Sequence, residues 1–253
     1  MQNEKEVQVL KRRLLDLANT CYYKEYPTYS DFLNLNEQSC FFEIQKELPP
    51  VSYCLWGGNE LSERRMLCFY TGLDTLETDT FPIRTLCIRP AHLKFAESLT
   101  HRDYLGAILN LGIDRCKIGD IMFEEQNAYV FVEESMCEYI RTSLEKVKHT
   151  NIICEEAKTD MVFEQKYKDI SGTVSSVRLD AVIATAFQSS RSKLLGLISG
   201  DKVFVNGRLI SSNSYRLKEG DIVSVRGMGK FLYAKEQAQT KKGKTKILLR
   251  KYI

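Results

Sequence analysis

The chain has 253 residues, of which 43% are hydrophobic and 27% are charged. This composition is typical of a water-soluble globular protein and excludes an intrinsically disordered one. No stretch is apolar over the roughly 20 residues that a membrane-spanning helix requires, so no membrane partner is expected. Residues 1–6 carry charges of both signs and lead directly into a helical pattern, which predicts a cytoplasmic protein without a signal peptide.

The eight cysteines all precede residue 155, and no two of them form a Cys-x-x-Cys pair. Structural zinc sites commonly use such closely spaced pairs, so we expect no metal. Most of the cysteines stand inside apolar runs, where a reduced thiol behaves as a small core side chain. The sequence therefore predicts reduced cysteines, and it indicates neither a metal nor an organic cofactor.

The net charge of +3 hides a strong asymmetry along the chain. Residues 171–253 carry 16 Lys and Arg against 5 Asp and Glu, a net charge of +11. Residues 1–170 carry 20 against 28, a net charge of −8. A basic segment of this kind is typical of a protein that meets a polyanion such as nucleic acid, because binding releases the counterions of the polyanion. A solvated basic tail is the alternative that charge leaves open.

Residues 1–78 are predicted to form an N-terminal helical and hairpin domain. Apolar residues that recur every three or four positions predict helices, and a proline pair ends the second helix because proline lacks the helical N–H. The predicted elements are a helix over Val7–Cys21, a helical pattern over Ser30–Leu48 broken near residues 34–36, and strands over 51–56 and 65–70.

Residues 79–172 show an order of elements that is typical of a ferredoxin-like, RRM-like domain: strand, helix, strand, strand, helix, strand. The aromatic platform on which RRM domains stack RNA bases is not evident, so we assign no base stacking to this sheet. The predicted strands cover 83–88, 118–123, 128–132 and 152–156, and the predicted helices cover 102–111 and 134–147.

The segment from Thr100 to Asp103 is interpreted as a helix start. A threonine followed three residues later by an acid forms a capping box, in which each side chain binds the backbone of the other. Gly106 inside this helix costs about 1 kcal/mol relative to alanine, so we expect it to permit close packing or the approach of a partner. Gly112 is expected to end the helix.

Residues 173–253 carry the most specific pattern. A first helix starts at Arg178, with its apolar residues on one face, and Ser189 and Ser190 can cap a second helix. Asn206-Gly207 between two apolar runs is a strong signal for a tight hairpin. A basic hairpin with strands over 231–237 and 247–252 is expected at the end of the chain.

These motifs together resemble the S4-type RNA-binding domain, a small module named after bacterial ribosomal protein S4. The resemblance is carried, in order, by Arg178-Leu179-Asp180, Ser190-Arg191, residues 198–200, residues 203–207 and Gly220-Asp221. It implies two short helices over a hairpin, which present cations and a helix N-terminus to RNA phosphates. The RNA-binding residues that it implies are Arg178, Ser190, Arg191, Lys193, Lys202, Arg208, Arg226 and Lys230.

Structural roles compete with RNA binding at some of these positions. Arg178 can pair with Asp180 or with Asp221, and Ser190 can cap its helix. Asn206 and Gly207 are interpreted as turn residues rather than RNA contacts.

The chain as a whole resembles the YlmH family. The resemblance is carried by residues 99–123 with His101-Arg102-Asp103, by Gly57-Gly58 with Glu63-Arg64-Arg65, and by the extension from Arg226 to Phe231. It implies an α+β protein with an N-terminal domain, an RRM-like middle domain and a terminal S4-type domain. The implied partners are rRNA of the large ribosomal subunit, tRNA, and a ribosome quality-control factor that acts on stalled nascent chains, with no small-molecule substrate.

Three functions remain open at this point. The leading hypothesis is a non-catalytic RNA-binding protein without catalytic residues. An RNA-modifying enzyme of the pseudouridine synthase or methyltransferase type is the second, but the sequence shows no glycine-rich cofactor loop, and capping or turn formation accounts for Asp103 and Asp120. An adaptor whose acidic N-terminal domains bind a protein partner is the third.

Overall fold

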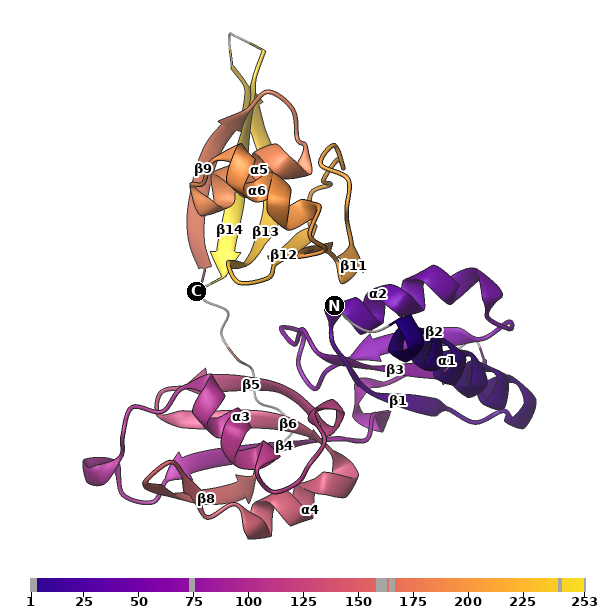
Figure 1. Ribbon diagram of the computed structural model, residues 1–253, viewed down its shortest axis with the longest axis vertical. Coiled ribbons are helices and arrows are strands. Elements are labelled where there is room, and N and C mark those ends of the chain that lie inside the picture. The colour runs from indigo at the N-terminus through magenta and orange to yellow at the C-terminus, as the bar shows by residue number, and fades with distance from the viewer. Residues whose placement is uncertain (1–3, 73–75, 158–162, 164–166, 241–242, 253) are drawn as a thin grey trace. The chain divides into compact units, whose positions relative to one another are not determined.

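The computed structural model describes residues 4–72, 76–157, 163, 167–240 and 243–252, without the side chains of Phe95, Arg191, Ser192, Lys193 and Leu195. The chain divides into two compact units, Met1–Phe163 and Glu164–Ile253 (Figure 1). Each mixes helices and antiparallel strands, which confirms the α+β fold class.

The first unit begins with two helices packed on a small antiparallel sheet of strand order β1-β3-β2. Residues 30–33, which we predicted to be helical, form a strand instead: the segment pairs with Arg65–Tyr70 and buries both faces, with Phe32 and Leu33 in different core clusters. Asn34 then caps the next helix, and Glu37 reaches back to the Asn34 backbone N–H at 2.6 Å. The elements are α1 Glu4–Lys24, β1 Thr28–Leu33, α2 Leu35–Ile44, β2 Ser52–Trp56 and β3 Arg65–Tyr70.

The middle of the chain folds as an antiparallel sheet of strand order β5-β6-β4-β8-β7 with two helices on one face. The order of elements confirms the RRM-like prediction. The second helix ends at Ser143 rather than at the predicted Val147, because Leu144 is extended and Lys146–Val147 pair with β8. The elements are β4 Ile83–Pro90, α3 His101–Leu109, β5 Ile118–Glu124, β6 Asn127–Glu133, α4 Glu134–Ser143, β7 Lys146–Val147 and β8 Thr150–Glu156.

The helix-free face of this sheet packs against the N-terminal part of the chain. Phe131 of β6 is 1% exposed and clusters with Phe32 and Met66. The Arg64 guanidinium donates to the carbonyls of Phe32 at 2.9 Å and Ile118 at 3.0 Å. The residues before and after Thr80 therefore form one compact unit.

Two aromatic side chains on this face escaped the sequence-based prediction. Tyr129 and Phe131 lie two residues apart on the central strand β6, which is where an RRM-type domain places stacking residues. The ring of Phe163 lies 5.2 Å from that of Tyr129, which is buried. Both Tyr129 and Phe131 are thus used in packing.

The capping box predicted at the start of α3 is confirmed, with Asp103 Oδ2 accepting from the Thr100 backbone N–H at 2.8 Å. A Cβ at Gly106 would meet nothing within 4 Å, so close packing does not account for this glycine. It lines an open groove of about 540 Å³ with Arg102, Lys146 and neighbouring residues.

The second unit is a six-stranded antiparallel sheet of order β11-β10-β12-β13-β14-β9. Residues 167–172, which we expected in the middle domain, belong to β9 and pair with β14. The proposed division into three domains otherwise stays a prediction. The elements are β9 Tyr167–Val174, α5 Leu179–Phe187, α6 Arg191–Ile198, β10 Val203–Val205, β11 Arg208–Leu209, β12 Ile222–Val225, β13 Gly229–Gln239 and β14 Thr245–Tyr252.

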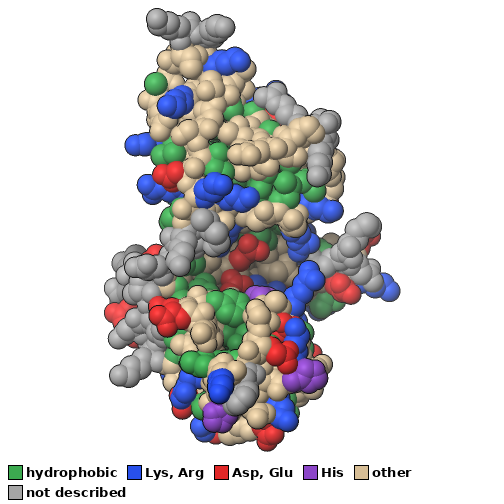
Figure 2. Space-filling view, turned by 90° about the vertical axis from the view of Figure 1, so that its left-hand side faces the viewer, with side chains coloured by type: hydrophobic (Ala, Val, Ile, Leu, Met, Phe, Trp, Pro, Cys, Tyr) green, Lys and Arg blue, Asp and Glu red, His purple; other side chains and the backbone are tan. Residues whose placement is uncertain are grey.

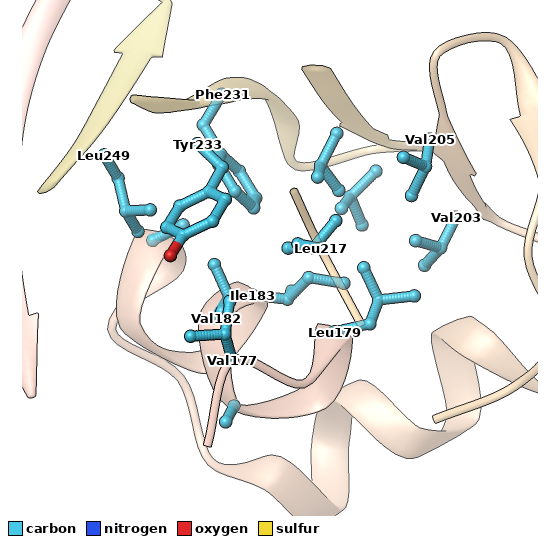
Figure 3. Packing of buried hydrophobic residues seen from close by; sticks show 14 of the residues in the cluster. Val177, Leu179, Val182, Ile183, Val203, Val205, Leu217, Phe231, Tyr233 and Leu249 are labelled. Carbon is cyan, nitrogen blue, oxygen red and sulfur yellow. The ribbon is translucent and has the colours of Figure 1, made fainter. Parts of the chain in front are cut away.

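The core of the second unit lies between this sheet and the two helices (Figure 3). Leu179 and Ile183 of α5 point toward Val203, Phe231 and Leu249 of the strands (Figure 3). Side chains alternate along a strand, so the residues between these core positions point to the opposite face. We call this opposite face, which lies away from α5 and α6, the outer face.

All eight cysteines are free thiols, as predicted. Burial raises the pKa of Cys68 and of Cys154 to about 12, which keeps both protonated at neutral pH.

Candidate nucleic-acid interface

Arg178 stands at the N-terminal end of α5 and is held by an acid of the same helix. Its Nε and one terminal nitrogen lie 3.1 Å and 3.3 Å from the two carboxylate oxygens of Asp180. The Arg178 side chain is 46% exposed, whereas Asp180 is only 9% exposed. Arg178 therefore pairs with Asp180 and not with Asp221, and the exposed side of its guanidinium still faces solvent.

Asp221 and Asn206 hold the hairpin together. Asp221 accepts from the Asn206 side-chain amide at 2.8 Å and from the Lys218 backbone N–H at 2.7 Å. Asn206 and Gly207 both have positive φ, 50° and 78°, as a two-residue type I′ turn requires. These two residues are turn residues, as predicted.

Ser190 directly precedes α6 and is exposed, and its carbonyl accepts from the Leu194 backbone N–H at 3.3 Å. Arg191 and Lys193 belong to the first turn of α6 by their backbone. Their side chains lie outside the described residues, so their exposure stays a prediction. Leu194 and Ile198 point into the core, which fixes the side of α6 that the sheet covers.

Lys202 and Arg226 are brought together by the backbone. The Arg226 N–H donates to the Lys202 carbonyl at 2.9 Å, and both residues are exposed. Arg208 is also exposed, but it follows the turn at the opposite end of β10, where it pairs with Val205. The eight predicted residues therefore do not form one cluster.

Arg226 and Lys230 both contact aromatic rings on the outer face. The Arg226 guanidinium lies 5.8 Å from the Phe204 ring centroid, and Lys230 Nζ lies 4.6 Å from that of Tyr252. Cations above aromatic rings at this distance are attracted by the ring quadrupole. Burial, together with the neighbouring Tyr167, raises the pKa of Tyr252 to about 12, so its hydroxyl stays neutral.

The surface of the second unit is rich in cations, as the space-filling view shows over the upper part of Figure 2. Two of its described cations pair with acids, Arg178 with Asp180 and Arg250 with Asp169 at 3.5 Å. Lys202, Arg208 and Arg226 are exposed, so part of the positive charge predicted from the sequence lies at the surface of this unit.

Within the described part of the chain, no group of three His, Cys, Asp or Glu side chains is placed to hold a metal ion. The described helices include none that is long and apolar enough to cross a membrane.

Comparisons with known proteins match both the RRM-like middle domain and the S4-type domain that the sequence predicted. Residues 77–161 match the family model "Putative RNA-binding domain in YlmH", and residues 177–223 match the S4 domain. The chain is 30% identical over 220 residues to "Ribosome-associated protein quality control protein P2" of Bacillus subtilis, which covers 86% of this chain and 84% of that protein. A solved structure, "Cell division protein ylmH from Streptococcus pneumoniae", is 21% identical with a TM-score of 0.49 and covers 60% of this chain and 92% of that one.

Proposed function

Because the chain belongs to the YlmH family, we propose that it binds structured rRNA on the large ribosomal subunit through its second unit. The observation that carries this proposal is the S4 domain match at residues 177–223, which lies inside a basic segment, residues 171–253, of net charge +11 with the exposed cations Lys202 and Arg226. Such a surface neutralises phosphates and gains free energy from counterion release. The Bacillus subtilis relative, which is named for its association with ribosomes, supports the choice of target.

The proposed role is in the quality control of stalled nascent chains, with tRNA and a quality-control factor as further partners. It rests on the same relative, whose name includes protein quality control. The role predicts tighter binding to large subunits that carry peptidyl-tRNA than to vacant subunits. Co-sedimentation with the two kinds of subunit measures this difference, and equal affinities would argue against a tRNA contact.

A salt series with purified large subunits tests the RNA surface. Arg191→Gln and Lys193→Gln are each expected to weaken binding and to lower the slope of log affinity against log salt by about 0.7 to 0.9, the value for one phosphate contact. Arg141→Gln is the matched control, because Arg141 lies in the first unit and pairs with Glu138 at 2.7 Å. Unchanged slopes in both α6 variants would contradict the proposed surface.

Binding without catalysis is part of the proposal. Nucleoside analysis of rRNA and tRNA after incubation with the protein, with and without a methyl donor, is expected to show no new modification. A modified uridine or a methylated base that depends on the protein would overturn this part.

A further inference from the structure

The outer face of the second sheet carries a row of side chains that crosses five strands. Phe204 of β10 lies opposite Ser224 of β12, and Ser224 lies opposite Lys230 of β13. On the next pair of strands, Phe231 of β13 lies opposite Lys251 of β14, which places Lys230 beside Tyr252. Tyr252 in turn lies opposite Tyr167 of β9. The aromatic row, as we name it, consists of Phe204, Ser224, Lys230, Tyr252 and Tyr167.

The strand pairing shows that this row points away from the helices. Its members alternate with Val203, Val225 and Phe231, which are buried in the core beneath α5 and α6. Tyr167, at the end of the row, is 38% exposed, and Tyr252 is half-buried. Phe204, at the other end of the row, is fully buried, so the part of the row that reaches the surface is the end formed by Tyr252 and Tyr167.

Rings and cations are in contact along this row. The rings of Tyr252 and Tyr167 meet edge to face with centroids 5.1 Å apart. Lys230 Nζ lies 4.6 Å from the Tyr252 ring, and the Arg250 guanidinium lies 5.9 Å from the Tyr167 ring. Holding cations beside partly exposed rings is the arrangement that proteins use to bind unpaired nucleotides, with bases on the rings and phosphates on the cations.

The charge of the outer face suits an anionic ligand. Arg250 and Lys246 point outward, because they alternate along β14 with the buried Ile247 and Leu249. Asp169 is an acid on this face, and it pairs with Arg250. Lys246 thus adds a cation to this face beyond Lys230 and Arg250, which contact the aromatic row.

Most of the aromatic row lies outside the region that matches the S4 domain. That match ends at residue 223, whereas Lys230, Arg250 and Tyr252 follow it and Tyr167 precedes it. The ladder β13-β14-β9 joins these residues into one surface on the face of the sheet that α5 and α6 do not cover. The aromatic row is consequently distinct from the proposed α6 surface.

We propose that the outer face is a second RNA site, which binds unpaired nucleotides by stacking bases on Tyr167 and Tyr252 and holding phosphates with Lys230 and Arg250. The proposal rests on the proposed function for the choice of RNA, and it adds single-stranded segments to the structured RNA assigned to α6. Stacking tolerates any base, so this site has little sequence preference.

The test uses the full chain, a fluorescently labelled 12-nucleotide oligouridine, and purified large subunits in parallel. Tyr252→Leu is expected to raise the oligouridine Kd about 5- to 100-fold, the range for losing one stacked base. Tyr252→Phe keeps the ring and is expected to bind within about twofold of the wild type. Arg250→Gln is expected to lower the salt slope by about 0.7, the value per phosphate of a single strand.

Lys251→Gln is the matched control. Lys251 carries the same charge on the same strand, but it points to the helix side, where its Nζ lies 4.8 Å from the Phe187 ring. This variant is expected to leave oligouridine binding unchanged. Thermal melting checks that each variant is folded, and Arg250→Gln with Lys230→Gln carries the test if Tyr252→Leu does not fold.

Three outcomes would overturn the second site. One is a wild-type protein that binds large subunits but not oligouridine, which would leave the proposed function standing. Another is oligouridine binding that survives both Tyr252→Leu and Arg250→Gln. The third comes from a competition experiment: if polyglutamate displaces the labelled oligouridine and unlabelled oligouridine of equal charge does not, the face binds an acidic protein instead. Loss of subunit binding in the α6 variants, with oligouridine binding intact, separates the two sites.

Discussion

The two units of this protein use the same number of cations in different ways. Residues 1–163 and 164–253 each contain 18 Lys and Arg, but the first unit has 26 Asp and Glu and the second has 7. In the first unit, cations meet carboxylates: Lys11 lies 2.7 Å from Glu43, and Lys117 bridges Asp31 and Glu133. In the second unit, the described cations more often face solvent or aromatic rings.

Aromatic residues show the same contrast. The first unit buries Phe32, Phe131 and Tyr129 between its two sheets. The second unit keeps Tyr167 and Tyr252 at the surface beside cations. The RRM-like sheet buries its aromatic side chains, whereas the strands β13, β14 and β9 leave theirs partly exposed. The type of domain therefore does not tell which sheet is available for stacking bases.

The largest expected effect comes from reversing charge in the second unit. Lys202→Glu with Arg226→Glu changes two exposed cations whose backbones are joined by a hydrogen bond. We expect the affinity for large subunits to fall about 100-fold at 0.15 M salt, because two phosphate contacts become repulsive. Sedimentation binding measures the change.

The control for this reversal lies in the first unit. Arg84→Glu with Arg89→Glu reverses two cations that pair with Glu134 and Glu155. This double variant is expected to change subunit affinity by less than threefold, since exposed ion pairs contribute little even to stability. Equal losses in both double variants would remove the distinction between the two units.

The second prediction concerns the packing that joins the two sheets of the first unit. Gly58 has φ of +87°, and a Cβ there would lie 2.4 Å from the Phe131 ring. Gly58→Ala adds both backbone strain and overpacking, so we expect the free energy of unfolding of the first unit to fall by about 2 to 4 kcal/mol.

Chemical denaturation followed by a signal from each unit measures this loss. The second unit and its RNA affinity are expected to stay unchanged in Gly58→Ala. Gly112→Ala is the control for backbone strain without overpacking, because its φ is also positive but nothing lies within 4 Å of the added Cβ. It is expected to cost about 1 kcal/mol.

Local patterns predicted much of this fold. The Thr100–Asp103 capping box, the Asn206-Gly207 turn and helix α5 were predicted because each depends on residues that lie close together in the sequence. The strand at Thr28–Leu33 was missed because it is buried on both faces, with Phe32 in one core cluster and Leu33 in another, so it lacks the apolar-polar alternation that marks a strand in a sequence.

The aromatic row could not be predicted, because it depends on long-range register. Tyr167 and Tyr252 are 85 residues apart in sequence and meet only because β14 pairs with β9 in one register. A shift by one residue would turn Tyr252 into the core and expose Leu249. The cations Arg226 and Lys230 were named from the sequence and their binding of RNA stays a prediction, but their placement on the outer face required the structure.

A third prediction addresses Arg178, a cation of the second unit that pairs with an acid of its own helix. Arg178 binds both carboxylate oxygens of Asp180 and keeps its remaining donors exposed. Arg178→Gln is expected to weaken subunit binding about threefold and to lower the free energy of unfolding by less than about 1 kcal/mol. A loss of stability with unchanged subunit affinity would class Arg178 with the structural ion pairs of the first unit.

The smallest expected effect is a titration in the first unit. Lys148 lies 2.9 Å from Asp103, and together with the Thr100 N–H and hydroxyl it lowers the pKa of Asp103 to about 2. A carboxyl whose pKa is lower in the folded state stabilises the fold above its unfolded pKa of about 4, and this stabilisation disappears as the pH falls from about 4 through about 2. Lys148→Gln is expected to raise the Asp103 midpoint toward 3.8 in a carboxyl-carbon NMR titration, whereas Lys146→Gln, whose side chain is exposed on the adjacent strand β7, leaves it unchanged. If the Asp103 midpoint stays near 2 in Lys148→Gln, the Thr100 capping contacts alone keep the pKa low. Ion pairing would then matter less in the first unit than its geometry indicates.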